Sequence, residues 1–302
     1  MNLRFVEAFY WVASLKSMSR AAEKLFITQS AMSSRIAALE GELGTLLLDR
    51  RDKQIRLTIA GSRFLDYAER MLALQREIKT EMGSPAARAL SLRMGAIESV
   101  LHSWLIDWLR HMRETEPGFE LELTVETTPL LIEQLRRGTL DLALAALPAD
   151  GEGLRSRALP PMEMAFVGKR TLHRKRSYTL AELAQFDLLT FQRGSQPHLA
   201  LLDLFRRTGL APPRVHAISS ISAIMQLVEG GFGIATLPLA AVRRLTDRLP
   251  LKPLRCDTPL PPLPVYLSYR HDPGSRGASG VVDAVLAYAD AVAKSSKKAI
   301  KT

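Results

Sequence analysis

Hydrophobic residues recur at helical spacing through residues 19–43, and the pattern predicts two short helices joined by a tight turn. Only Phe26 and Ile27 separate the two helices, and Thr28 can cap the free amides of the second one. The polar side of the second helix carries small hydrogen-bonding groups and one guanidinium: Gln29, Ser30, Ser33, Ser34 and Arg35. Such groups in the first turns of a helix are typical of a recognition helix that meets base edges in the major groove of DNA. An ordinary helical hairpin with a solvated polar face is the alternative.

The segment that follows predicts a small basic hairpin. Residues 46–48 and 55–57 are apolar enough to form two short strands, and a charged turn lies between them. This turn carries Arg50, Arg51 and Lys53. A basic hairpin directly after a helix-turn-helix is typical of a wing that contacts phosphates or the minor groove. A surface hairpin with ordinary charge would show the same residues.

A single long helix is predicted after the hairpin, ending at Gly83-Ser84-Pro85. Its apolar positions follow alternating steps of four and three residues: Phe64, Ala68, Met71, Ile78 and Met82, with Gln75 as the polar exception. This heptad spacing indicates a seam that packs against another helix. The seam could pack on its own domain. A helix of this length between two domains has little else to cover it, so pairing with a second chain is our preferred interpretation.

From residue 91 onward, short apolar runs alternate with amphipathic segments. Strands are predicted over residues 92–97, 121–126, 141–146, 164–168, 188–191, 215–219, 233–237 and 265–269. Helices are predicted over residues 101–113, 130–137, 197–207, 222–229 and 278–293. Alternation of this kind predicts a mainly parallel sheet covered by helices. Sheets of that type bind ligands at the carboxyl ends of their strands.

Composition narrows the classes of protein that fit this pattern. The 302 residues are 47% hydrophobic and 24% charged, which suits two or three globular cores, and the net charge of +10 favours a polyanionic partner. Cys256 is the single cysteine, so an internal disulfide and a multi-cysteine metal site are excluded, and the six histidines lack metal-ligand spacing. We expect no secretory signal, because the first residues are predicted to form an amphipathic helix, and the sequence shows no apolar run long enough to span a bilayer. We therefore expect a soluble cytoplasmic protein.

The N-terminal part contains a specific signature, composed of Phe5, Ala8, Ser19, Ala21–Leu25, Gln29–Ser33, Ile36, Leu39–Glu40, Leu43–Gly44, Leu47–Leu48, Arg50 and Leu57–Gly61. With these residues, positions 2–83 resemble the DNA-binding half of the LysR-type transcriptional regulators. Two positions depart from the family pattern, which usually has proline at Ser30 and phenylalanine at Leu48. Without that proline, the base preferences of the recognition helix remain open.

The C-terminal part carries a looser match, in Met94–Ala96, Leu135–Ala145, Val228 and Gly231–Pro238. These stretches resemble the effector-binding domain of the same family, which is built like a periplasmic binding protein. The resemblance implies two α/β lobes joined by two crossing strands, with the effector in the cleft between them.

Together these resemblances imply a multidomain protein with an all-α winged helix-turn-helix N-terminal domain, a long linker helix and an α/β periplasmic-binding-protein-like effector domain of two lobes. We expect the winged helix-turn-helix in residues 1–61, the linker and dimerisation helix in 62–83 and a hinge in 84–89. We expect the first lobe in residues 90–161 and 269–294, the second lobe in 162–267 and a basic tail in 295–302.

The expected site residues follow from this organisation. We expect DNA contacts from Ser19, Gln29, Ser30, Ser33, Ser34, Arg35, Arg50, Arg51 and Lys53. We expect effector contacts from Ser99, Thr127, Thr128, Gln192, Arg193, Ser195, Phe232 and Thr236. Most of the latter lie in loops that lead from a strand into a helix, where free amides favour an anion such as an organic acid. Simple helix capping is the alternative for each Ser and Thr. Glu98 would repel an anion unless it points away or the effector also carries a cation, so the effector is left unnamed.

The sequence therefore predicts a sequence-specific DNA-binding transcriptional regulator whose action is controlled by a small molecule bound between the two lobes. We expect as partners double-stranded DNA, the effector, other copies of the chain as a dimer of dimers, and RNA polymerase, with no membrane, metal or cofactor. An enzyme is the second hypothesis, but the chain lacks the common phosphate-binding, zinc-protease and serine-hydrolase motifs, so no catalytic residue is assigned. A transport binding protein is the third, and the missing export signal speaks against it. Target genes, and activation or repression, are left open.

Overall fold

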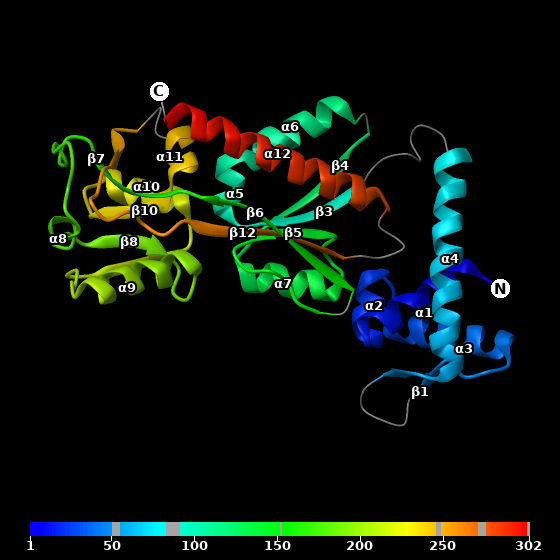
Figure 1. Ribbon diagram of the computed structural model, residues 1–302. Helices are drawn as coiled ribbons and strands as arrows, with labels where there is room; N and C mark the ends of the chain where they lie inside the picture. Colours follow the sequence, from blue (N-terminus) through cyan, green and yellow to red (C-terminus); the bar gives the residue numbers. More distant parts are fainter. Residues whose placement is uncertain are drawn as a thin grey trace.

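The computed structural model describes residues 1–49, 55–82, 91–116, 118–151, 153–245, 249–270 and 276–300. Three bodies lie in a row in Figure 1: a helical N-terminal domain, a middle lobe and an outer lobe. The N-terminal domain consists of α1 (Leu3–Leu15), α2 (Met18–Lys24), α3 (Gln29–Leu43), β1 (Leu48–Asp49), β2 (Arg56–Leu57) and α4 (Ile59–Met82). The predicted helix-turn-helix and the antiparallel strand pair of the hairpin are both present.

Local hydrogen bonds fix the ends of these helices. Ser17 caps α2 and Thr28 caps α3, where the Thr28 hydroxyl accepts the Ala31 amide at 3.2 Å. Helix α3 ends at Gly44, whose φ of 66° is a left-handed conformation that glycine adopts without strain. The buried carboxylate of Glu40 then accepts the backbone amides of the next segment. These bonds determine where α3 begins and ends.

The predicted seam of α4 is divided in the structure. Its first part packs into the N-terminal domain itself, because Phe64 meets Phe9 with ring centroids 5.3 Å apart and Ala68 is fully buried. Farther along α4, the apolar side chains of Tyr67, Leu74 and Ile78 are exposed. The first part of the predicted seam thus packs on its own domain, as the alternative interpretation has it, whereas Ile78 of the same seam stays exposed beside Tyr67 and Leu74.

The first lobe is built on a five-stranded sheet in the order β4-β3-β5-β12-β6. Its strands are β4 (Glu120–Val125), β3 (Ser91–Ala96), β5 (Leu142–Ala145), β12 (Leu263–Arg270) and β6 (Leu154–Met162). The first three are mutually parallel, and β12 runs antiparallel to both of its neighbours. One face carries α6 (Ile106–Thr115) and α12 (Arg276–Ile300), and the other carries α7 (Thr128–Arg137) (Figure 1).

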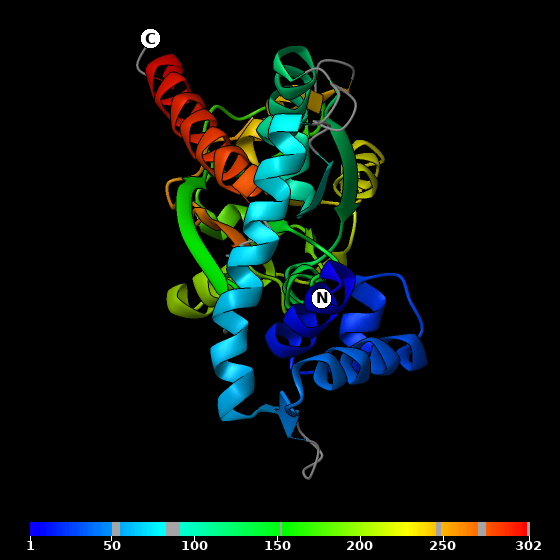
Figure 2. The same cartoon turned by 90° about the vertical axis from the view of Figure 1, so that its right-hand side faces the viewer.

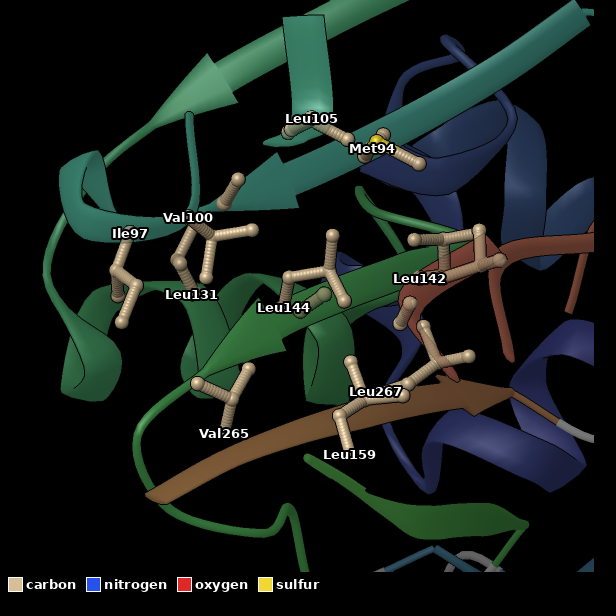
Figure 3. Close-up of a cluster of buried hydrophobic side chains, with 14 of the residues drawn as sticks. Met94, Ile97, Val100, Leu105, Leu131, Leu142, Leu144, Leu159, Val265 and Leu267 are labelled. Atoms are coloured by element: carbon tan, nitrogen blue, oxygen red, sulfur yellow. The ribbon is translucent and has the colours of Figure 1, made fainter. Parts of the chain in front are cut away.

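Aliphatic side chains fill the first lobe between the sheet and its helices. Figure 3 shows a part of this core, with Met94, Ile97, Val100, Leu105, Leu131, Leu142, Leu144, Leu159, Val265 and Leu267 labelled. The helix above β3 contains α5 (Glu98–Val100), a π-helical turn (Leu101–Leu105) and α6 (Ile106–Thr115) in direct succession. Alternation along the strands and the stripe on each helix thus account for this core.

The second lobe is built on a sheet in the order β11-β7-β10-β8-β9. Its strands are β11 (Leu251–Leu254), β7 (Met164–Lys169), β10 (Ile234–Pro238), β8 (Leu188–Phe191) and β9 (Val215–Ile218). Its helices are α8 (Leu180–Leu183), α9 (Gln196–Thr208), α10 (Ile221–Glu229) and α11 (Leu239–Leu245). Separate apolar clusters cover the two faces of the sheet. Parallel pairing of β10, β8 and β9 brings the loops after these strands to one edge.

Two crossing segments join the lobes, as the sequence predicts: one between β6 and β7, and one between β11 and β12. The expected division at residue 267 is wrong, because the whole of β12 pairs in the sheet of the first lobe. Strands β6 and β11 were not predicted. Both contain proline, and both are edge strands, where the missing amide of proline is tolerated. Among the described residues, no helix is long and apolar enough to cross a membrane.

Candidate functional site

The first surface of interest is the start of α3. Gln29, Ser30 and Ser34 are exposed there, and Ser33 and Arg35 are half-buried on the same helix. Arg35 has no hydrogen-bond or ion-pair partner within the described part of the chain. The structure therefore presents the predicted polar side chains together, with one free guanidinium among them.

Helix α2 also contributes to this surface. The hydroxyl of Ser19, in the first turn of α2, donates to Oε1 of Gln29 at 3.3 Å. Ser30 and Thr28 share a hydrogen bond of 3.0 Å, and Ser34 donates to the carbonyl of Ser30. The predicted wing residues Arg50, Arg51 and Lys53 lie outside the described residues.

A second site is a cavity of about 610 Å³ between the two lobes. Six of the eight predicted effector residues line it: Ser99, Thr127, Thr128, Gln192, Arg193 and Ser195. They reach it from three strand-to-helix loops, those before α5, α7 and α9. A volume of this size suits a small organic ligand.

Several polar groups in the cavity are not used by the fold. The Ser99 side chain is 3% exposed, and its hydroxyl has no partner among the described residues. Thr127 precedes α7 but makes no side-chain cap there, and the exposed guanidinium of Arg193 has no ion-pair partner in the described ranges. Thr128 and Ser195 differ, because their hydroxyls accept the amides of Ala146 and His198. Simple capping therefore accounts for Ser195, and a bond to the segment after β5 accounts for Thr128. Neither explanation applies to Ser99, Thr127 or Arg193.

Two predicted effector residues lie away from the cavity lining. The hydroxyl of Thr236 is fully buried and donates to Oγ1 of Thr190 at 2.8 Å. Phe232 is 64% exposed. The expectation that these two residues close the cavity wall is wrong, because the glycine-rich turn that carries Phe232 leads into β10 at the end of the strand remote from the cavity loops.

Glu98 lines the cavity, yet its carboxylate is directed to the second lobe. Oε2 accepts the amide of Ile221 at 2.8 Å, and Oε1 accepts the hydroxyl of Ser220 at 3.2 Å. Nε2 of His102 lies 3.4 Å from Oε1. Burial raises the pKa of Glu98, but the hydrogen bonds from His102, Ile221 and Ser220 outweigh burial, so its pKa lies below the ordinary value. The predicted conflict with an anion is reduced because this charge already caps α10.

A second bond between the lobes lies farther along the same helix. Nη2 of Arg244, on α11, donates to Oδ1 of Asp107 at 3.1 Å, and Nη1 contacts the other carboxylate oxygen. Nη1 also donates to the carbonyl of Ser103 at 3.3 Å. The lobes are thus joined on one side of the cavity by two carboxylates of the first lobe.

Comparison with known proteins finds a match for each of the two parts of the chain. The family model described as "LysR substrate binding domain" matches residues 86–290, and the one described as "Bacterial regulatory helix-turn-helix protein, lysR family" matches residues 3–62. The chain belongs to the LysR family of transcriptional regulators. It is a DNA-binding regulator with a C-terminal domain that binds a small-molecule effector.

Individual LysR-family relatives cover most of the chain. A "Probable hydrogen peroxide-inducible genes activator" of Mycobacterium avium is 30% identical over 275 residues, which are 89% of this chain and 88% of the relative. The "HTH-type transcriptional regulator BudR" of Raoultella terrigena is 31% identical over 246 residues, 79% and 84% of the two chains. The structure of an OxyR mutant from Corynebacterium glutamicum is 27% identical, with a TM-score of 0.59, and covers 99% of this chain and 95% of that one.

Sequence reasoning missed part of the cavity of this LysR-family chain. Ser219 and Ser220 line it from the loop between β9 and α10, and Glu126 and Leu147 line it from the first lobe. The two serines follow a strand and precede a helix, as the predicted residues do, so the same signal could have found them. Leu147 has no such signal, because an apolar residue after a strand fits an ordinary loop as well.

Proposed function

We propose that the cavity between the lobes binds a small organic acid. The observation that carries this proposal is the convergence of Ser99, Thr127 and Arg193, three hydrogen-bonding groups without partners among the described residues, on one cavity. Two hydroxyls near the first turns of α5 and α7 can donate to a carboxylate, and a guanidinium supplies the opposite charge. Gln192 adds an amide to the same wall.

Binding assays can test the ligand class directly. Benzoate, succinate and glutamate are suitable acid probes, and butylamine is the cationic control. An acid that fits should raise the Tm of the full chain, because a ligand that binds only the folded state stabilises it. Ser99→Ala and Arg193→Met should each weaken its Kd about tenfold, since each removes a bond to a charged group. Arg207→Met, at the far end of α9, should leave the Kd unchanged. Binding that survives both cavity substitutions would contradict the proposal.

We also propose that α3 reads the operator through Gln29, Ser30, Ser33, Ser34 and Arg35, with Ser19 beside them. Arg35→Ala and Ser33→Ala should reduce the preference for a selected operator over random duplex, since each removes a possible contact to a base edge, at about 1–3 kcal/mol each. Arg50, Arg51 and Lys53 are proposed as phosphate contacts, so their loss should weaken binding to every duplex and reduce its salt dependence. Unchanged discrimination by both α3 variants would mean that another element reads the bases.

We infer that the regulator works as a homo-oligomer, a dimer of dimers, in which α4 pairs with α4 of a second chain. The exposed stripe of Tyr67, Leu74 and Ile78 supports this pairing. Leu74→Glu should therefore lower the molecular mass in solution by light scattering, whereas Leu199→Glu, at an exposed position on α9, should not. Two-fold symmetry predicts partly palindromic half-sites. Because its partner is chromosomal DNA, we place the protein in the cytoplasm, where RNA polymerase is a further candidate partner.

Peroxide sensing, suggested by the printed name of the mycobacterial relative, is less well supported in this chain. Reactive cysteines are thiolates of low pKa. Burial and the neighbouring Asp257 raise the pKa of Cys256, and its Sγ lies 3.5 Å from Oδ1 of that carboxylate. No second cysteine exists to form a disulfide with it. We therefore favour a bound effector over a redox signal, and we infer a regulatory rather than an enzymatic role. If the chain converted a bound acid into a product, the regulatory role would be contradicted.

A further inference from the structure

The N-terminal domain touches the first lobe through a small polar contact. Nζ of Lys24, at the end of α2, lies 3.5 Å from Oδ1 of Asp141 in the first lobe, and the lysine side chain is only 8% exposed. The same ammonium lies 4.6 Å from the centroid of the Trp11 ring on α1. An ammonium group that has lost most of its water needs such replacements. Asp141 and Trp11 together supply them.

The first lobe presents a matching surface to this lysine. The guanidinium of Arg270 lies over the same Trp11 ring at 5.5 Å. Arg93 holds Asp141 in place, with Nη2 2.5 Å from Oδ1 and Nε 3.1 Å from Oδ2. Gly138 ends α7 beside them, and a Cβ added there would lie 3.4 Å from Cδ of Lys24. The end of α7 and the end of α2 are therefore in direct contact.

This contact lies at the end of the first lobe opposite the cavity, and the same elements reach both. Strands β3 and β5 begin near Arg93 and Asp141, and the loops that follow them line the cavity. Helix α7 begins at the cavity and ends at Gly138. Strand β12 runs from Leu263, which lines the cavity, to Arg270. In Figure 1, α2 lies beside the end of the first lobe, whereas α3 lies on the far side of the N-terminal domain.

We propose that Trp11, Lys24, Asp141 and Arg270 form an intramolecular latch that orients the DNA-binding domain on the first lobe. The latch leaves the polar side of α3 open, so duplex can bind while the latch is closed. Figure 2 shows α4 passing in front of the effector domain, with α1 and α3 grouped beside its lower part. The latch fixes the N-terminal domain directly to the sheet of the first lobe, whose loops line the cavity. It thereby sets the direction in which α3 of each chain points. The inference rests on the proposed roles of α3 and the cavity.

A zero-length crosslink tests the latch itself. Carbodiimide joins an amine to a carboxylate only where the two groups touch, so the full chain should yield a peptide crosslinked from Lys24 to Asp141. The Lys175–Glu182 pair, 2.5 Å apart within the second lobe, is the positive control. Lys24→Arg keeps the charge but cannot be coupled, and should lose only the first crosslink. Mixed oligomers of ¹⁴N and ¹⁵N chains should show that the crosslink joins residues of one chain.

A DNA titration tests what the latch does. Selection from a random DNA library with the parent protein supplies a duplex with two half-sites. A second duplex keeps only one of these half-sites. Lys24→Met should raise the Kd for the two-half-site duplex roughly fivefold, because freely oriented domains lower the effective concentration of the second binding event. It should leave the Kd for one half-site within about twofold. Lys24→Arg should resemble the parent, and Lys175→Met, which removes an exposed lysine elsewhere, should change neither Kd.

The outcomes separate the latch from the proposed function. The intramolecular latch would be overturned if the Lys175–Glu182 crosslink formed and the Lys24–Asp141 crosslink did not. It would also be overturned if the Lys24–Asp141 crosslink joined only ¹⁴N chains to ¹⁵N chains. Equal effects of Lys24→Met on both duplexes would overturn its orienting role. If the parent selects no sequence, the proposed reading role of α3 fails, and the crosslink still decides whether the latch exists.

Discussion

The carboxylate of Glu98, in the first lobe, accepts the backbone amide of Ile221, in the second lobe, at 2.8 Å. A side chain expected to disturb an anion site thus serves as the N-terminal cap of a helix more than 120 residues away. Glu98 also lines the cavity, so this bond between the lobes lies beside the proposed ligand site.

Removing this cap should destabilise the effector domain. Glu98→Ala leaves the Ile221 amide without its acceptor, and we expect the free energy of unfolding to fall by about 1–3 kcal/mol. Urea denaturation of the full chain at pH 7 measures the change. Glu126→Ala, in the same cavity but without a bond to the second lobe, should stay within about 0.5 kcal/mol of the parent. If the two variants lost the same free energy of unfolding, the bond between Glu98 and Ile221 would not contribute to stability.

Glu40 should be essential to the N-terminal domain. Its Oε1 accepts the amides of Leu47 at 2.8 Å and Leu48 at 3.1 Å, and all three residues are buried. Glu40→Ala leaves two buried donors unpaired, so we expect a loss of about 2–4 kcal/mol. Denaturation followed by circular dichroism measures it, and Glu40→Gln, which retains an acceptor, should recover part of it. Glu42→Ala removes an exposed carboxylate on the same helix and should cost less than about 1 kcal/mol.

Gly61 permits a close approach between α4 and the segment after α3. A Cβ added at this position would lie 2.0 Å from the carbonyl oxygen of Leu47. Gly61→Ala should therefore destabilise the domain by about 2 kcal/mol or more, because backbone must move to make room. Gly41→Ala, on α3 with no atom within 4 Å of the added Cβ, should instead stabilise it by about 0.5–1 kcal/mol. Thermal unfolding of both variants should give Tm changes of opposite sign, and a parallel shift would refute this packing.

Acidification should lower the stability of the folded chain, because it protonates Asp141. Burial raises the pKa of Asp141, but hydrogen bonds from Arg93 and the charges of Lys24 and Arg93 outweigh it, so its pKa lies below the ordinary value. A carboxyl whose pKa is lower in the folded state contributes stability above its unfolded pKa of about 3.9, and that contribution is lost as the pH falls through the folded value.

Asp141→Asn should therefore lower the free energy of unfolding at pH 7 by about 1–2 kcal/mol and reduce the further loss between pH 5 and acid. Urea titrations at several pH values measure both effects. Asp290→Asn, on the exposed side of α12, is the control for removing one carboxylate elsewhere. An acid response of Asp141→Asn identical to that of the parent would contradict the assignment.

The local sequence pattern predicts much of this structure, and the elements and contacts that it does not predict depend on distant parts of the chain. Thr28 and the apolar spacing from Met32 to Leu39 predicted α3, because capping and helical period are local properties. The prolines of β6 and β11 concealed two strands, because sheet position decides whether a missing amide matters. The pairs Glu98–Ile221 and Lys24–Asp141 join residues far apart in the chain, and no periodicity signals such contacts. The three strand-to-helix loops predict most of the residues that line the cavity. Phe232 and Thr236, which do not line it, were assigned to the cavity from a family motif and not from their place at the end of a strand.

The π-helical turn from Leu101 to Leu105 has a consequence for how the effector domain holds together. One residue more in a turn rotates everything downstream by about 100° relative to a regular α-helix. With that rotation the carboxylate of Asp107 meets Arg244, and the next side chain, Trp108, is buried. Shortening the turn by one residue would regularise the helix and swing the carboxylate out of reach. A local departure from regular helical winding thus positions one of the two carboxylates that join the lobes.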